Sequence, residues 1–185
     1  MTLPFYSVGH STRTIAEFVA LLRAADVDRV VDIRTIPRSR TNPQYNKDTL
    51  PAHLSAFGID YTQIAELGGR RSKSKTIPPQ LNAYWDNRSF HNYADYALTE
   101  TFASGLAELI ELGRKQRCAM MCSEAVWWRC HRRIVTDHLL ARGERVFHLM
   151  HPDRIEPAAL TKGAQVQDHA AVTYPGAPTE QAIAH

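Results

Sequence analysis

The chain begins with two short apolar runs on either side of a stretch with helical spacing. Residues 5–10 (FYSVGH) and 29–34 (RVVDIR) are short and mostly apolar, which is typical of buried strands. Between them, residues 14–27 repeat apolar side chains every three or four positions, and Thr14 with Glu17 has the capping-box pattern of a helix start. This order of strand, helix and strand predicts a parallel crossover unit.

The same alternation continues along the chain. It predicts strands over 60–64, 117–122 and 145–150, and helices over 46–58, 93–113 and 126–143. Residues 68–79 (GGRRSKSKTIPP) hold too much glycine, proline and charge for either element, and so long a loop indicates function or mobility. The pattern predicts an α/β fold, a three-layer sandwich with a mainly parallel, Rossmann-like or flavodoxin-like sheet of about four to six strands.

The composition changes after His151. Residues 1–151 are predicted to form a single α/β domain, whereas 152–185 are rich in alanine, proline and glutamine and are expected to form a C-terminal arm. Two short stretches on either side of Asp168 and His169 would suit a short hairpin, and the last residues are expected to be disordered.

The overall composition is that of an ordinary globular protein. Of the 185 residues, 44% are hydrophobic and 22% are charged, and no run of about 18 apolar residues predicts a membrane span. The first residues lack the basic start and apolar run of a signal peptide, so we expect a cytoplasmic protein. The three cysteines are clustered, which fits reduced thiols better than a disulfide framework. The net charge of +3 permits nucleic acid as a partner without indicating it.

Polar residues follow three of the predicted strands, at the point where each strand ends. The carboxyl ends of parallel strands meet at one edge of a sheet, so these residues should surround a single pocket. Guanidinium groups, small hydroxyls and backbone amides together suit a phosphate or carboxylate ligand. The alternative is that the arginines of RTIPRSR form a solvated basic loop. The expected ligand-binding residues are Gly9, Ser11, Arg34, Arg38, Ser39, Arg40, Tyr45 and Arg132.

Cys122 is the strongest nucleophile candidate in the sequence. It ends a predicted strand and precedes a predicted helix, where the helix dipole and nearby arginines would lower a thiol pKa. Cys118, inside the strand, is expected to be a buried apolar residue. The segment after Cys122 differs from a phosphatase or rhodanese loop, because Arg129 lies seven positions after the cysteine instead of six, and Trp127 and Trp128 stand in place of glycines.

Two further residues are candidates for acid–base catalysis. Glu124 is expected to act as a general base or to pair with Arg34 or Arg132, and its plainer interpretation is a carboxylate near a helix N-terminus. His10 is the second candidate. Asp32 lies between apolar neighbours within a strand and needs a partner, for which Arg34 on the same face is the obvious choice.

A metal site is the alternative use of the cysteines. It would be built from Cys122, Cys130 and His131, with His10 or His148 as a further ligand, but the spacing matches none of the common zinc patterns. Cys130 and His131 fall inside the helix predicted over 126–143, where core packing is the default for Cys130.

Several motifs resemble the domain of unknown function 488 family of small bacterial and archaeal proteins. They are SVGHST, DIRTIPRSRTNPQYN, LGGRR, HNYADY and MCSEAVWWRCHRRIV, and the resemblance runs from about Tyr6 to Met150. It implies a cytoplasmic α/β protein and supplies no reaction. The chain departs from the family pattern at AVWW, where small or polar residues are usual, and at EPAAL, which lacks a histidine. The family positions carried over are Gly9, His10, Ser11, Asp32, Arg34, Pro37, Ser39, Arg40, Tyr45, Gly68, Gly69, Tyr93, Ala94, Cys122, Glu124, Cys130, His131 and Arg132.

Three functions fit these observations. The first is an enzyme, a hydrolase or transferase, that binds a phosphate-containing small molecule, a nucleotide or a nucleic-acid end. The second is a non-catalytic nucleic-acid or partner-binding module, since residues 1–145 have a net charge of +5. The third is a Cys/His metal or thiol-redox protein. The sequence requires no cofactor, and no membrane partner is expected.

Overall fold

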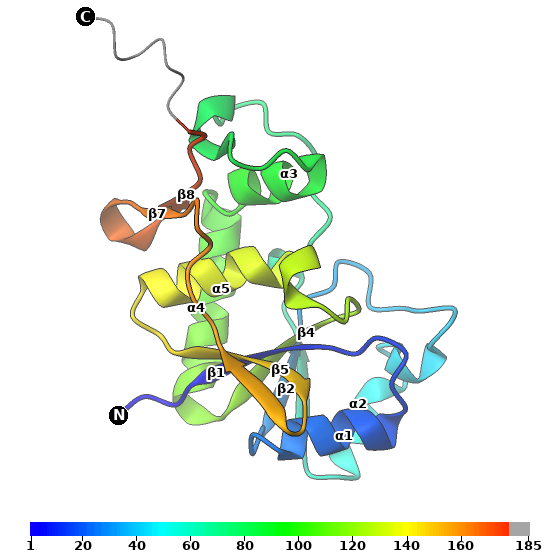
Figure 1. Ribbon diagram of the computed structural model, residues 1–185. Coiled ribbons are helices and arrows are strands. Elements are labelled where there is room, and N and C mark those ends of the chain that lie inside the picture. Colours follow the sequence, from blue (N-terminus) through cyan, green and yellow to red (C-terminus); the bar gives the residue numbers. More distant parts are fainter. Residues whose placement is uncertain (178–185) are drawn as a thin grey trace, which may run out of the picture.

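The computed structural model describes residues 1–177, and six strands form its central sheet (Figure 1). The order of the strands is β3-β2-β4-β1-β5-β6. The strands β1 to β5 pair in parallel, and β6 pairs antiparallel with β5 at the edge of the sheet. The bounds are β1 Phe5–Gly9, β2 Arg29–Asp32, β3 Asp60–Gln63, β4 Cys118–Cys122, β5 Val146–His151 and β6 Arg154–Pro157. The predicted α/β sandwich with a mainly parallel sheet is confirmed.

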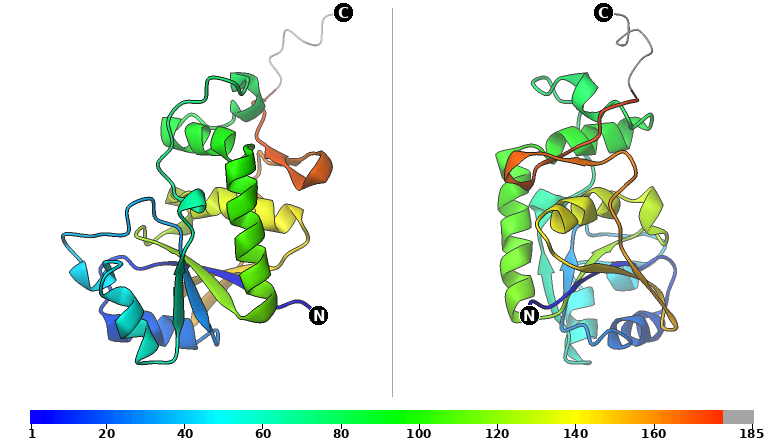
Figure 2. Two further views of the ribbon diagram at one scale, coloured as in Figure 1. Left: turned by 180° about the vertical axis from the view of Figure 1, so that it is seen from behind. Right: turned by 60° about the vertical axis from the view of Figure 1, so that its left-hand side comes forward.

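Helices cover both faces of the sheet (Figure 2). One face packs against α1 and α2 through a cluster that includes Phe18 and Leu54, and the other packs against α3, α4 and α5 through a cluster that includes Leu106 and Ile134. Both faces of the strands are therefore buried, which explains why the strands are continuous apolar runs. The helix bounds are α1 Ile15–Arg23, α2 Leu50–Ser55, α3 Arg88–Tyr96, α4 Glu100–Lys115 and α5 Arg132–Ala141. Short 3-10 helices lie at Pro43–Tyr45, Ala65–Leu67, Pro79–Asn82, Trp127–Arg129 and Asp168–Ala170.

Three helices differ from their predictions. The helix predicted over 46–58 is limited to α2, and the one predicted over 93–113 is divided into α3 and α4. Thr99 makes this division, because its hydroxyl donates to the Tyr96 carbonyl at 2.7 Å and accepts the Phe102 N–H at the start of α4. The prediction over 126–143 is wrong at its start, since α5 begins only at Arg132.

The segment expected to be a separate arm contributes to the domain. It supplies β6 at the sheet edge and a two-stranded sheet of β7 (Gln165–Val166) and β8 (Val172–Thr173). Val172 and Tyr174 are fully buried in the core cluster of α3, α4 and α5. The end of the chain expected to be disordered lies, from residue 178 on, outside the described residues. Among the described residues, no helix combines the length and apolar character needed to cross a membrane.

Candidate functional site

The carboxyl ends of β1, β2 and β4 lie side by side and carry the loops of the candidate site (Figure 1). Gly9 pairs with Cys122 where β1 and β4 end. Beyond these ends, the N–H groups of His10 and Ser11 donate to the carbonyls of Cys122 and Ser123 at 2.9 and 3.0 Å. The loop after β4 is thereby held against the loop after β1.

Gly9 and Arg132 shape the loop after β4. A Cβ at position 9 would overlap the carbonyl oxygen of Glu124, so only glycine allows this approach. The buried guanidinium of Arg132 donates to the same oxygen at 2.7 Å and to Ser7 Oγ at 3.3 Å. Both residues were expected to bind ligand, but neither lines the pocket described next.

A pocket of about 510 Å³ opens at this edge of the sheet. It is bounded by the loops after β2 and β4, the start of the 68–79 loop and the first turn of α3. Of the residues expected at the site, Arg34, Arg38, Cys122 and Glu124 line it, together with the alternative metal ligands Cys130 and His131.

A thiol and an imidazole meet in this pocket. Cys130 Sγ lies 3.5 Å from His131 Nδ1, and His131 Nε2 lies 2.8 Å from the Ile33 carbonyl oxygen. Because that carbonyl can only accept, Nε2 carries a proton, and Nδ1 is the ring nitrogen that faces the sulfur. Cys130 Sγ also accepts from the backbone N–H and the Nε–H of Arg132, both at 3.4 Å.

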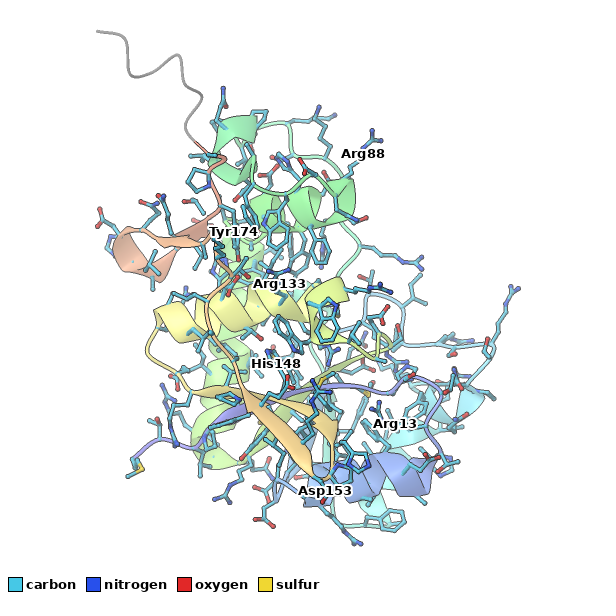
Figure 3. All side chains as sticks on the ribbon, viewed as in Figure 1. Arg13, Arg88, Arg133, His148, Asp153 and Tyr174 are labelled. Atoms are coloured by element: carbon cyan, nitrogen blue, oxygen red, sulfur yellow. The ribbon has the colours of Figure 1, made fainter. Side chains whose placement is uncertain are left out.

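This arrangement corrects the prediction that Cys130 and His131 lie inside a helix. Cys130 follows the Trp127–Arg129 3-10 helix, and His131 is the residue before α5. Trp127 anchors this loop, because its ring stacks on His148 with centroids 4.4 Å apart. Figure 3 shows His148 between α5 and the sheet. The tertiary contact replaces the helical turn that the local pattern favours.

The two pocket cysteines differ in acidity. Burial raises the pKa of the Cys122 thiol well above its ordinary value, and the Cys130 sulfur adds to the rise. Burial alone would also raise the pKa of Cys130, but the Cys122 thiol, His131 and Arg132 outweigh it and hold that pKa well below its ordinary value. The structure therefore favours Cys130 over Cys122 as the thiolate.

Arg34 is held in place by Asp32, the partner expected from the sequence. Its Nε and Nη2 donate to the two carboxylate oxygens at 2.9 and 2.7 Å, and both residues are buried. The hydroxyl of Tyr61 donates to the same carboxylate at 2.5 Å, and Arg34 Nη2 also donates to the Tyr45 carbonyl. Arg34 is thus a fixed part of the pocket wall.

Three other arginines line the pocket with exposed side chains: Arg38, Arg70 and Arg129. Arg38 lies 3.4 Å from Asp48, but both side chains are more than 70% exposed, so this pair is weak. Within residues 1–177, Arg70 and Arg129 have no ion-pair partner. Arg70 was missed because it lies in the 68–79 loop, for which the sequence indicated a functional segment without naming residues.

His10 lies behind the pocket wall rather than in it. It is 1% exposed, stacks on Tyr45 with ring centroids 4.1 Å apart, and its Nδ1 lies 2.9 Å from the Ser11 carbonyl oxygen. Burial lowers the pKa of His10 to about 4. Its Nε2, 3.3 Å from an Arg34 nitrogen, is left to accept. The contacts make His10 a neutral support for Arg34.

The other expected ligand-binding residues also lie outside the pocket lining. Ser39 caps its own loop, where its hydroxyl accepts the Asn42 N–H at 2.9 Å. The Tyr45 hydroxyl donates to the Arg13 carbonyl at 2.9 Å. Arg40 is exposed, and Ser11 contributes its backbone in a left-handed conformation with φ of 50°.

Asn87 and Ser89, at the start of α3, line the pocket although the sequence did not indicate them. The side chain of Asn87 caps α3 by accepting the N–H groups of Ser89 and Phe90 at 2.9 and 3.2 Å. The helix predicted over 93–113 begins too late to include this turn, since α3 begins at Arg88, and an asparagine that can cap a helix does not by itself indicate a pocket.

Comparison with curated proteins and with solved structures gives no match. The family model described as "Domain of unknown function DUF488" matches residues 14–139, more than half of the chain. The match covers β2, β4, the loop after β4 and most of α5, and hence Asp32, Arg34, Cys122, Cys130 and His131. The chain therefore belongs to the DUF488 family.

Proposed function

We propose that the protein is an enzyme, a hydrolase or transferase, that binds a phosphate-containing small molecule, a nucleotide or a nucleic-acid end in this pocket. The observation that carries the proposal is that four arginines share one pocket with an oriented thiol–imidazole pair. Guanidinium groups bind phosphate oxygens through paired hydrogen bonds. A pocket that only binds an anion does not need a pair of chemically reactive groups held in contact with each other. We place this activity in the cytoplasm, where thiols remain reduced.

The charge of the pocket supports an anionic ligand. Among the described residues, the pocket lining contains one carboxylate, that of Glu124, and four arginines: Arg34, Arg38, Arg70 and Arg129. Asp32 neutralises Arg34 from behind the wall, so the positive charge available to a ligand comes mainly from the three exposed arginines. The N-terminus of α3 adds the partial positive charge of its helix dipole.

The size of the pocket favours a small ligand or the end of a chain. A volume of about 510 Å³ lies within the range of small-molecule sites. A module that coats a nucleic-acid backbone would instead use an extended basic groove. This comparison favours the enzyme over the non-catalytic binding module.

Binding of inorganic pyrophosphate and of ATP, measured by calorimetry, is the first test. Arg70→Ala and Arg129→Ala should each weaken binding about tenfold to a hundredfold, because each removes charge-assisted hydrogen bonds to the phosphate. Arg154→Ala is the matched control, since Arg154 is exposed on β6 and pairs with Glu156 away from the pocket. Equal affinity in all four proteins would contradict the proposed site.

Turnover is tested with a panel of phosphomonoesters, phosphodiesters and nucleotides. Glu124 lines the pocket, is exposed, and receives one long contact of 3.4 Å from the Val126 N–H. In a general acid–base role, Glu124→Gln should reduce turnover about a hundredfold or more while leaving the melting temperature unchanged and binding of the anionic ligand at least as tight as in the wild type. Binding of phosphate ligands with no turnover of any panel member would favour the non-catalytic module.

A further inference from the structure

The floor of the pocket brings three metal-binding atoms together. One donor atom each from Cys122, Cys130 and His131 lies within 4.8 Å of the other two. In a tetrahedral zinc site, ligand distances of 2.3 Å for sulfur and about 2.05 Å for nitrogen place two sulfurs about 3.8 Å apart and a sulfur and a nitrogen about 3.6 Å apart. The Cys130–His131 separation of 3.5 Å already fits this geometry.

The surroundings of the donors resemble those of a metal site. Metal-binding histidines usually donate their second ring N–H to a carbonyl or carboxylate, and His131 Nε2 does so to Ile33. The Nδ1 atom is thereby left free as a ligand. Cys130 Sγ accepts two N–H groups from Arg132, contacts that hold a thiolate in position.

The backbone at Gly69 packs on the face of the His131 imidazole. A Cβ at position 69 would lie 2.5 Å from His131 Nδ1, the atom that would bind the metal. The same Cβ would lie 2.8 and 2.9 Å from Cγ and Cε1 of that ring, so it would sit over the ring face, and glycine lets the backbone pack there and fix the plane of the imidazole. Gly69 and the three donor residues all line the pocket, so a metal bound there would be reachable from the ligand side.

We propose that Cys122, Cys130 and His131 bind a divalent metal ion of the zinc class, with one coordination position open to the arginine-lined pocket. Two thiolates and one imidazole are ligands that select zinc over magnesium or calcium, and three protein ligands with an open position are typical of catalytic rather than structural zinc. Metal binding needs only these three residues. The further role of the open position, to receive an oxygen of the phosphate-containing ligand, rests on the proposed function.

The test uses the full chain, kept reduced, stripped of metal with a chelator and titrated with Co²⁺ and then with Zn²⁺. Cobalt should bind at one equivalent with a thiolate-to-cobalt charge-transfer absorption and tetrahedral d–d bands, and zinc should displace it. Cys122→Ser and Cys130→Ser should each lose the charge-transfer intensity and weaken binding at least tenfold. Cys118→Ser, at the other end of β4, is the matched control and should leave the spectrum unchanged.

A second variant separates metal binding from loss of the fold. Gly69→Ala places a methyl group against His131 and keeps both thiols, so it should weaken zinc binding about tenfold to a hundredfold while circular dichroism stays that of the wild type. Absence of thiolate–cobalt absorption in reduced, folded wild-type protein would overturn the inference. So would unchanged cobalt binding in Cys130→Ser.

The two proposals fail separately. Pyrophosphate binding that depends on Arg70 and Arg129 in metal-free protein, with no cobalt binding, would retain the phosphate site and reject the metal. Cobalt binding without any pyrophosphate binding would retain the metal and reject the phosphate ligand. A change in the cobalt d–d bands on addition of pyrophosphate supports the open position, and an unchanged spectrum with pyrophosphate bound contradicts it.

Discussion

Three histidines of this chain are buried in the interior and are held neutral there. Burial is the main cause in each case, and it lowers the pKa of His10 and His148 to about 4 and that of His138 to about 3. His138 is 1% exposed, packs edge-on against Phe102, and its Nε2 atom lacks a hydrogen-bond partner among residues 1–177. An ionised imidazole at this position would lose most of its solvation.

The fold should therefore lose stability in mild acid. Below the unfolded pKa near 6.5, the unfolded chain takes up protons that the folded chain takes up only near pH 3–4, so the free energy of unfolding falls as the pH drops through this window. His138→Leu should reduce that slope by up to about 1.4 kcal/mol per pH unit between pH 6 and 4. Urea unfolding at several pH values measures how the free energy of unfolding depends on pH. The same pH dependence in the variant and the wild type would contradict the conclusion that His138 is held neutral by burial.

At the scale of elements, the local sequence predicts the start of one helix correctly and the start of another wrongly. The capping box predicted at Thr14 and Glu17 is confirmed by two reciprocal hydrogen bonds of 3.1 Å. The start of α5 was predicted wrongly because the loop before it is ordered by contacts with β5 and with the loop after β1. The packing of α4 on the sheet also depends on a small residue, Gly113. A Cβ at this position would overlap the ring of the fully buried Phe5 in β1.

Gly113→Ala should destabilise the protein although alanine favours a helix. The gain in helix propensity is about 1 kcal/mol, whereas overpacking against Phe5 costs about 1–3 kcal/mol. We expect a net loss of about 1 kcal/mol in the free energy of unfolding by urea. Ser104→Ala, at an exposed position of the same helix, should instead gain a few tenths of a kcal/mol. A more stable Gly113→Ala protein would show that α4 can shift away from the sheet.

For the whole molecule, the segment after β6 closes the core. Tyr174 donates its hydroxyl to Asp137 in α5 at 2.7 Å, and its N–H donates to Asn82 at 3.1 Å. Asp137 also accepts the Thr161 N–H at 2.9 Å. Figure 3 shows Tyr174 beside α5, close to Arg133. One buried carboxylate thus joins α5 to two points of the C-terminal segment.

Tyr174→Phe should lower the free energy of unfolding by about 1–3 kcal/mol, because it removes a hydrogen bond from a carboxylate that remains buried. Tyr84→Phe is the control, since the Tyr84 hydroxyl has no hydrogen bond within the described part of the chain. The melting temperatures of the two variants are compared by thermal unfolding monitored with circular dichroism. Equal melting temperatures would mean that Asp137 obtains sufficient partners without Tyr174.

The sequence by itself determined the five parallel strands of the central sheet and the edge where polar loops gather, but not β6 or the order of the strands. These follow from apolar runs and helical spacing, which are local patterns. It also indicated the Asp32–Arg34 pair, because alternate residues of a strand share a face.

The tertiary structure alone decided which of these polar residues share the pocket. The Cys130–His131 pair, the entry of Arg70 and Arg129, and the supporting roles of His10, Tyr45 and Arg132 depend on contacts between loops far apart in the chain. Such contacts are set by the shape of the folded backbone, for example by the glycine at position 9 and the Ile33 carbonyl that orients His131. The shape of the folded backbone cannot be inferred from residue types and their spacing in the sequence, because the number of residues between two loops does not determine the distance between them.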